Sequence, residues 1–301
     1  MKVVKHLLVI VFAVSMAVVV NAQQPNTPNT SMTQGGPGAA ANSPEIEDVY
    51  KRENIIATKK PIPYPYLREA DVMWSKDMWR FIDLRQRMNY PLRFPETEAI
   101  GNRYSLYLLL MEGIKAKEIT PYAYTENWNN PFNQPTTLKD IYGSSKIGAD
   151  TIWGPNNTVS KIDLKGSTIK GFYVKEKWYF DKQHSEMRVR ITALAPLIIR
   201  QKMQNGQPLP GFDRIIPFFV YFPQCRNLFA THPVFNPNND AQNISFDDLF
   251  IQRRFASNIA AESNEFGNRF IVDYLTGQDA LMEAERIKND LFLMEHDMWE
   301  Y

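Results

Sequence analysis

The residues VKEKWYFDKQHSEMRVRI, Val174–Ile191, decide the fold class of this chain. Side chains alternate between two faces with a period of two, first over 174–181 and then over 187–193. The second run alternates Met187, Val189, Ile191 and Ala193 with Arg188, Arg190 and Thr192. This period is that of a β-strand, and the polar half of the second run indicates one solvated face. Ile215–Phe222 is a further apolar run, in which Pro217 favours an edge position or a bulge. The sequence therefore predicts a small antiparallel sheet.

Helical spacing lies on the N-terminal side of this sheet. Apolar residues recur at spacings of four, three and seven between Asp71 and Tyr90, at Trp74, Met78, Phe81 and Met88. We expect a helix there, with Asp71 as its cap and Tyr90-Pro91 as its stop. A second, mostly buried helix is expected over Tyr104–Lys117.

The C-terminal third also predicts helices. Ser245-Phe246-Asp247-Asp248 resembles a capping box that opens a helix to about Glu262. Thr276–Asp279 opens a last helix, whose core-facing stripe is Leu281, Ala284, Ile287, Leu291 and Met294. The intervening segment 121–154 is expected to be mostly loops, with Trp128 and Trp153 reaching back into the core. The predicted fold is α+β, a small antiparallel sheet covered by helices from the N- and C-terminal parts.

The first 22 residues have the pattern of a Sec-type signal peptide. Lys2 and Lys5 precede an apolar run, Leu7–Val20, and cleavage is expected after Ala22. The alternative is a membrane anchor, but a bilayer span needs about 20 apolar residues. The next residue would be Gln23 instead of Cys, so the signal predicts export without a lipid anchor.

A flexible linker is expected after the signal peptide. Residues 23–60 begin with an uncharged stretch, 23–44, that is rich in Gln, Asn, Thr, Pro and Gly. Pro61–Tyr66 then alternates proline with apolar residues, which favours an extended arm. The arm could dock on a neighbour or on its own domain. The remaining residues, 61–301, are expected to form a single globular domain.

The composition limits the possible partners and chemistry. The 301 residues carry 34 Lys and Arg against 33 Asp and Glu, a formal net charge of +1. This balance gives no case for nucleic acid or an anionic membrane surface. Cys225 is the single cysteine, so the chain has neither an internal disulfide nor a cysteine-based zinc site. A Cys225–His232 nucleophilic pair remains an alternative to a buried thiol, because such pairs are assembled in space.

Common catalytic motifs are missing from the sequence. It contains no GxxxxGK[ST], GxGxxG, GxSxG or HExxH pattern. His296 and Glu300 could share a helix face as metal ligands or could simply be solvated. Asp247 and Asp248 are better explained as first-turn charges than as a catalytic pair, and a salt-bridge role is favoured for Arg253 and Arg254. No catalytic, cofactor-binding or metal-binding residue is therefore assigned, and no cofactor is expected.

Four long blocks resemble a known family. They are DVMWSKDMWRFIDLRQRMNYPL (Asp71–Leu92), VKEKWYFDKQHSEMRVRI (Val174–Ile191), SFDDLFIQRRFASNIAAESN (Ser245–Asn264) and ALMEAERIKNDLFLMEHDMWE (Ala280–Glu300). In this order they resemble the GldN/PorN family of gliding-motility proteins from Bacteroidota, over roughly 62–301. The signal peptide and polar lead also fit that family.

The resemblance implies a non-enzymatic periplasmic component of the type IX secretion system. It implies a ring subunit that assembles with a GldK/PorK-type outer-membrane lipoprotein and contacts the GldL/GldM (PorM-type) motor. Trp74, Trp79 and Trp178 fall in the matched blocks, and we consider them possible structural or interface anchors. The expected location is the periplasm, peripheral to the outer membrane, with no membrane span and no nucleic acid.

Two other classes of function stay open at this point. One is an exported hydrolase whose site combines dispersed carboxylates with His184 or His232. The other is a peptidoglycan-binding or cell-wall protein, which would need exposed aromatic residues. A pocket with perturbed pKa values would favour the hydrolase, and a flat apolar patch would favour the ring subunit.

Overall fold

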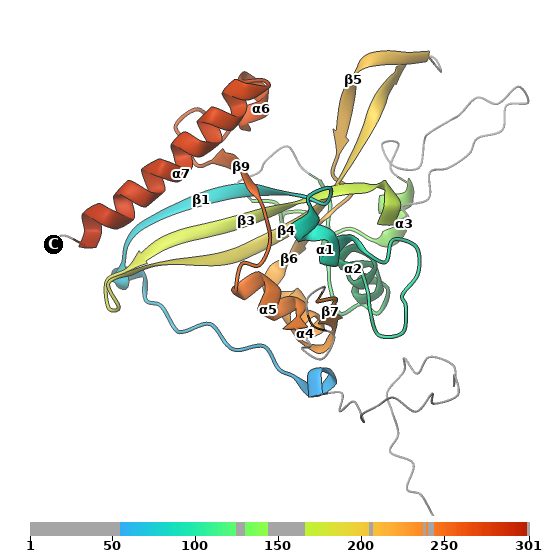
Figure 1. Ribbon diagram of the computed structural model, residues 1–301, viewed down its shortest axis with the longest axis horizontal. Helices are drawn as coiled ribbons and strands as arrows, with labels where there is room; N and C mark the ends of the chain where they lie inside the picture. The colour runs from blue at the N-terminus through green and yellow to red at the C-terminus, as the bar shows by residue number, and fades with distance from the viewer. Residues whose placement is uncertain are drawn as a thin grey trace, which may run out of the picture. The chain divides into compact units, whose positions relative to one another are not determined.

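Three long antiparallel strands form the centre of the computed structural model (Figure 1). They are β1 (Val72–Asp83), β3 (Ile169–Asp181) and β4 (Glu186–Gln204). The structure describes residues 55–124, 130–143, 166–204, 207–236, 239 and 244–299. Contacts divide the chain into two units, Met1–Glu47 and Asp48–Tyr301, and all described residues belong to the second.

Shorter strands complete the sheet in the described part of the chain. They are β2 (Pro121–Tyr122), β5 (Gln207–Ile215), β6 (Phe219–Tyr221) and β9 (Asn258–Glu262). The order is β2-β6-β4-β3-β1-β9, and β5 pairs with β4 as a hairpin that leaves the rest of the sheet (Figure 1). A separate pair is formed by β7 (Pro233–Val234) and β8 (Ile244–Ser245). The predicted antiparallel sheet is confirmed, but it is larger than expected.

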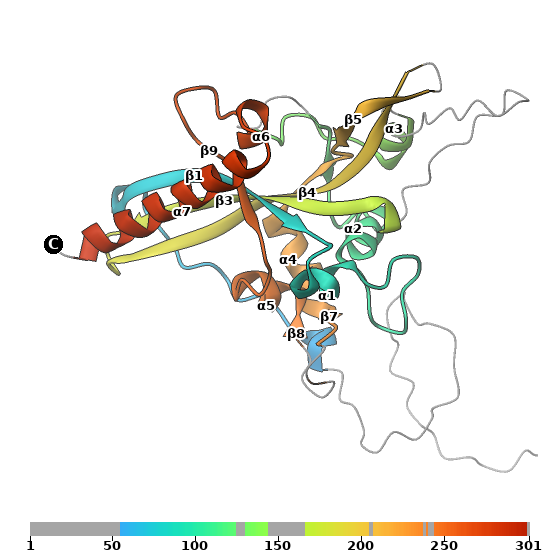
Figure 2. The same ribbon diagram turned by 45° about the horizontal axis from the view of Figure 1, so that its top comes forward.

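The helices lie at different ends of this sheet. The α-helices are α1 (Tyr90–Arg93), α2 (Leu106–Lys115), α3 (Leu138–Gly143), α4 (Phe222–Thr231), α5 (Phe246–Ile251), α6 (Ile271–Tyr274) and α7 (Gln278–Trp299). Short 3-10 helices are η1 (Ile55–Thr58), η2 (Glu69–Asp71), η3 (Arg87–Asn89) and η4 (Gly166–Thr168). Figure 2 shows α7 lying along one end of the sheet, away from α2, α4 and α5. The predicted α+β fold is confirmed.

One face of the central strands carries two separate hydrophobic cores. Alternate residues of a strand share a face, so Met78 and Ile82 of β1 point the same way. Ile82 belongs to the core formed with α2, α4 and α5, whereas Met78 belongs to the core under α7. The opposite face carries a third, largely aromatic cluster that includes Trp79 and Tyr173. The sheet therefore holds all three clusters together.

The helix predicted over Asp71–Tyr90 is wrong. Most of this segment is β1, which pairs with β3 over its length and with β9 over Met78–Phe81. Its middle residues are buried on both faces, Met78 and Ile82 on one and Trp79 on the other. Burial on both faces removes the simple alternation of a strand, so the remaining apolar spacing imitates a helix.

Two other predicted elements end earlier than expected. The Ser245 capping box is confirmed, but α5 stops at Ile251, and Arg253 adopts a positive φ of 54° before β9 begins. The predicted strand 215–222 is split, because Ile216–Phe218 separates β5 from β6 and Phe222 begins α4. Pro217 lies at this break. Proline has no N–H to donate, and at this position between strands the sheet requires no hydrogen bond from it.

The remaining predicted helices are confirmed in part, and several other predictions concern residues that the structure does not describe. The helices over 104–117 and from Thr276 exist as α2 and α7, and Ser245 and Ser105 both cap helices through their hydroxyls. In the α7 stripe, Ala284, Ile287 and Leu291 are buried, whereas Leu281 is 58% exposed. The signal peptide, the first part of the linker, Trp128 and Trp153 lie outside the described residues.

The proline-rich arm docks on the protein's own domain. Arg226 donates to the carbonyl of Ile62 at 2.7 Å, and Arg190 donates to that of Pro65 at 2.6 Å. The ring of Tyr64 lies against both guanidinium groups, 4.3 Å from that of Arg226 and 5.1 Å from that of Arg190. Of the two placements left open by the sequence, the structure shows the intramolecular one.

Candidate functional site

The thiol of Cys225 is inert in this structure. It is fully buried in α4 and donates to the carbonyl of Tyr221 at 3.5 Å, and burial raises its pKa far above the ordinary value. The imidazole of His232 instead contacts the carbonyl of Leu228 at 2.9 Å and the ring of Tyr104. Within the described residues, the alternative of a Cys225–His232 pair is therefore not formed.

The other histidines do not assemble a metal or catalytic centre either. Nδ1 of His184 lies 2.7 Å from Asp181. Burial raises the pKa of that carboxyl, but hydrogen bonds from His184 and the Gln183 amide outweigh it and hold the pKa below its usual range. His296 is exposed on α7, and Glu300 lies outside the described residues. No group of three potential metal ligands occurs in the described part of the chain.

A buried ion cluster joins the two cores on one face of the sheet. Glu176 of β3 is completely buried and lies 2.9 Å from both Arg80 of β1 and Arg253 after α5. The indole nitrogen of Trp178 also donates to this carboxylate at 2.9 Å. Burial lowers the pKa of Arg80, and the Glu176 charge opposes that shift. Oε2 of Glu176 accepts from Arg80, Arg253 and Trp178, while Oε1 lies 2.9 Å from Arg253 without hydrogen-bond geometry, so this carboxylate links three parts of the chain.

The second buried pair anchors the arm. Arg226 and Asp247 form a bidentate pair, at 2.9 and 3.0 Å, in which both side chains are nearly inaccessible. Burial raises the pKa of Tyr64, which lies on Arg226. Asp248 accepts from Ser245 at 2.7 Å and pairs with Lys59. Asp247 and Asp248 thus contact different partners, as expected for first-turn charges.

The three matched tryptophans lie in two different clusters. Trp79 is 3% exposed and belongs to the aromatic cluster with Phe219. Trp74 and Trp178 are half-buried and pack beside the core under α7. All three therefore contact the protein's own cores, and a role in binding a partner stays a prediction.

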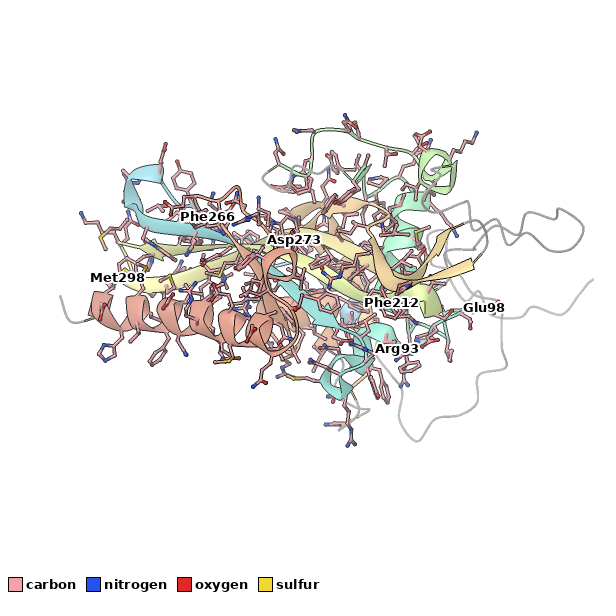
Figure 3. The ribbon with its side chains drawn as sticks, turned by 90° about the horizontal axis from the view of Figure 1, so that it is seen from above. Arg93, Glu98, Phe212, Phe266, Asp273 and Met298 are labelled. Atoms are coloured by element: carbon pink, nitrogen blue, oxygen red, sulfur yellow. The ribbon has the colours of Figure 1, made fainter. Side chains whose placement is uncertain are left out.

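Two surfaces expose large apolar side chains beside charge. Helix α7 exposes Leu281, Met282, Phe292, Leu293 and Met294. We call the side of α7 that faces away from Ala284, Ile287 and Leu291 its outer face, and it carries Met282, Phe292 and Leu293. At the base of the β4–β5 hairpin, a cavity of about 670 Å³ is lined in part by Phe212, which is 70% exposed. Figure 3 labels Phe212 and Arg93, which both belong to this lining. The cavity is lined by Phe81, Asp83, Leu84, Arg85, Arg93, Ile169, Lys170, Ile199, Phe212 and Arg214. We call it the hairpin cleft.

The sequence analysis missed the ion cluster and the hairpin cleft. A signal for Glu176 was present, because the alternation of β3 places it on the apolar face between Val174 and Trp178. A carboxylate at such a position requires partners. The predicted salt-bridge role is confirmed for Arg253. The cleft had no local signal, because its lining comes from five separate stretches of chain.

The described residues form an α+β protein in which Cys225, His232 and the buried acids contact the protein's own groups. Residues 67–300 match the family described as gliding motility associated protein GldN, so the chain belongs to the GldN family. The family implies a component of gliding motility and type IX secretion. A search of the curated proteins finds no match. Among the helices that the structure describes, none has the length and apolar character to cross a bilayer.

Proposed function

We propose that this chain is a non-enzymatic periplasmic ring subunit of the type IX secretion system. It assembles with a GldK/PorK-type outer-membrane lipoprotein, contacts the GldL/GldM-type motor and associates with its own copies. The family match over 67–300 carries this proposal, and it agrees with the resemblance of the four sequence blocks. Export by the Sec signal peptide and attachment through the lipoprotein are part of it.

The chemistry of the described residues supports a structural role. Glu176, Asp181 and Asp247 are the buried carboxylates among the described residues, and each is paired with a cation or a histidine. A general acid or base must reach a substrate atom, whereas these groups are occupied by the protein itself. Exposed apolar side chains beside charge are instead typical of protein interfaces.

The three tryptophans remain proposed anchors, but their exposure differs, so they would contribute to partner binding in different ways. Trp74 and Trp178 keep part of their rings accessible, so they could contact a partner directly. Trp79 is buried, so we expect it to act only through the core that it supports. A charged residue at Trp79 is expected to unfold the subunit and would not report on a partner.

Purification from the native envelope tests the assembly. We expect tagged protein to bring down a lipoprotein partner and ring-shaped particles. A tagged protein that is recovered alone, in folded form and from gently solubilised envelopes, would contradict the proposed ring.

Alanine substitutions separate the ring subunit from the exported hydrolase. Replacing Cys225, His184, His232 or His296 by Ala should leave secretion intact wherever folded protein accumulates. A hydrolase that used one of these residues should lose about a hundredfold or more in rate. Loss of secretion in one variant, with normal protein level, stability and ring assembly, would favour the enzyme.

A further inference from the structure

The hairpin cleft has more positive charge than its own acids neutralise. Among the described side chains, four cations line it, Arg85, Arg93, Lys170 and Arg214, against one carboxylate, that of Asp83. Asp83 binds Arg85 in a close pair, at 2.7 Å. Arg93 lies 2.7 Å from Glu96 beside the cleft.

Lys170 and Arg214 are the two lining cations that have no carboxylate partner among the described residues. Lys170 contacts the carbonyl of Ser167 at 3.4 Å, and no described carboxylate lies within salt-bridge distance of Lys170 or Arg214. The other lining residues include five apolar side chains, among them the exposed Phe212. The cleft therefore suits an acidic surface that also offers apolar side chains.

The outer face of α7 has the complementary character. The helix holds six carboxylates against two cations, a formal net charge of −4 with His296 neutral. Its inner side is fixed to the body by Ala284, Ile287 and Leu291. Phe292 and Leu293 point away from that core, at 65% and 56% exposure. Asp290 and Asp297 lie three and four residues from Leu293, so they flank it on the helix surface. Asp290 already pairs with Arg286 of the same helix at 2.6 Å, whereas no described cation lies within salt-bridge distance of Asp297.

The two surfaces occupy different ends of the molecule. In Figure 3, Met298 marks the C-terminal end of α7 on the left, whereas Phe212 and Arg93 lie together on the right. A helix face held at one end cannot fill the cleft at the other end of the same copy. A contact between two different patches is heterologous, and its repetition produces a ring or an open filament.

We propose that the hairpin cleft binds the outer face of α7 of a second copy of this chain. Phe292 and Leu293 supply the apolar contact, and Asp290 and Asp297 face Lys170 and Arg214. This inference rests on the proposed self-association and names the two surfaces that make it.

Two charge-reversed variants test this contact in purified full-length mature protein. The cleft variant is Lys170→Glu with Arg214→Glu, and the helix variant is Asp290→Lys with Asp297→Lys. By sedimentation velocity at low salt, we expect wild-type protein to self-associate and each variant alone to associate about tenfold more weakly or worse. Lys115→Glu with Lys139→Glu is the matched control, because both lysines are exposed and lie outside both surfaces.

Mixing the two variants gives the decisive measurement. The cleft variant keeps a normal α7 and the helix variant keeps a normal cleft, so one intact interface can form between them. We expect the mixture to recover association and to grow with the two variants alternating, because the native contact is intact on one side and the two charge-reversed surfaces are again opposite in charge on the other. A mixture that stays monomeric, or variants that associate as wild type does, would overturn the inference.

The outcome is independent of the lipoprotein purification. Wild-type protein that stays monomeric across the micromolar range at low salt would overturn this contact, even if the lipoprotein co-purifies. Failure to recover the lipoprotein, with normal complementation between the variants, would instead contradict the proposed assembly while leaving this contact intact.

Discussion

Glu176 illustrates how one residue can determine whether two cores stay together. On β3 it lies between Val174, in the core beneath α2, α4 and α5, and Trp178, beside the core under α7. Arg80 occupies the equivalent place on β1, between Ile82 and Met78. The charge pair therefore fills the gap between two apolar regions, and Arg253 ties it to the chain after α5.

Removal of this carboxylate should be costly. Glu176→Ala leaves two partly buried guanidinium groups without their counter-charge, and we expect the free energy of unfolding to fall by about 3 kcal/mol or more. Urea denaturation measures the change. Glu285→Ala, which breaks an exposed pair with Lys288, is the control and should change stability by about 0.5 kcal/mol or less. Equal effects of the two variants would show that burial does not govern the cluster.

At the scale of elements, α5 and α7 show what holds short and long helices in place. The six residues of α5 depend on their capping box and on packing, because an isolated helix of this length is unstable in water. The much longer α7 buries only one side, through Ala284, Ile287 and Leu291. The capping box therefore stabilises the start of α5, whereas a narrow apolar stripe holds α7 against the sheet.

The cap of α5 makes stability depend on pH through Asp248. Burial raises the pKa of this carboxyl, but hydrogen bonds from Lys59 and Ser245 outweigh it and hold the folded-state pKa below its usual value. Its stabilisation is therefore present above the unfolded pKa of about 3.9 and is lost as pH falls through the folded-state pKa.

Asp248→Asn should accordingly lower the free energy of unfolding at neutral pH by about 1 kcal/mol. The difference from wild type should shrink as the pH falls below about 4, where the native carboxyl becomes neutral. Denaturation at a series of pH values tests this expectation. Asp279→Asn, an exposed first-turn acid of α7, is the control. A gap that stays constant down to low pH would contradict the charge-based explanation.

The stripe of α7 can be tested by placing a charge on each side of the helix. Ile287 is 1% exposed, so Ile287→Asp should release α7 from the sheet and speed amide hydrogen exchange throughout the helix. Leu281→Asp, at a position 58% exposed, should leave the exchange rates nearly unchanged. Continued protection of α7 in the Ile287 variant would show that its other contacts suffice.

For the whole molecule, the central strands make the two faces of the sheet dependent on each other. Phe172 of β3 belongs to the core with α4 and α5, and its neighbour Tyr173 belongs to the aromatic cluster on the opposite face. Loss of packing on either face loosens the same strand. We therefore expect these two clusters to unfold together.

Conservative substitutions on the two faces test this cooperativity. Phe172→Leu and Phe219→Leu should each lower the free energy of unfolding by about 1 to 2 kcal/mol. The near-UV and far-UV circular dichroism midpoints should move together in both variants. Phe212→Leu, at a position 70% exposed, is the control for the loss of a ring. Separate midpoints would show that one face unfolds without the other.

Elements whose signal is local could be predicted from the sequence. The strands of Val174–Ile191 are fixed by alternation, α7 by an apolar stripe and the start of α5 by Ser245, because each signal depends only on neighbours along the chain. The four blocks also determined the family, which the match over 67–300 confirms. The absence of common catalytic motifs could likewise be established from sequence.

Elements and sites that depend on partners far away in the sequence could not be predicted in this way. Strand β1 forms because β3 and β9 pair with it and both its faces become buried, which overrides a helix-like spacing at Trp74, Met78 and Phe81. The same pairing brings Arg80 to Glu176, 96 positions away. The hairpin cleft likewise exists only once β1, β3, β4 and β5 lie together, since no single stretch of sequence contains its lining.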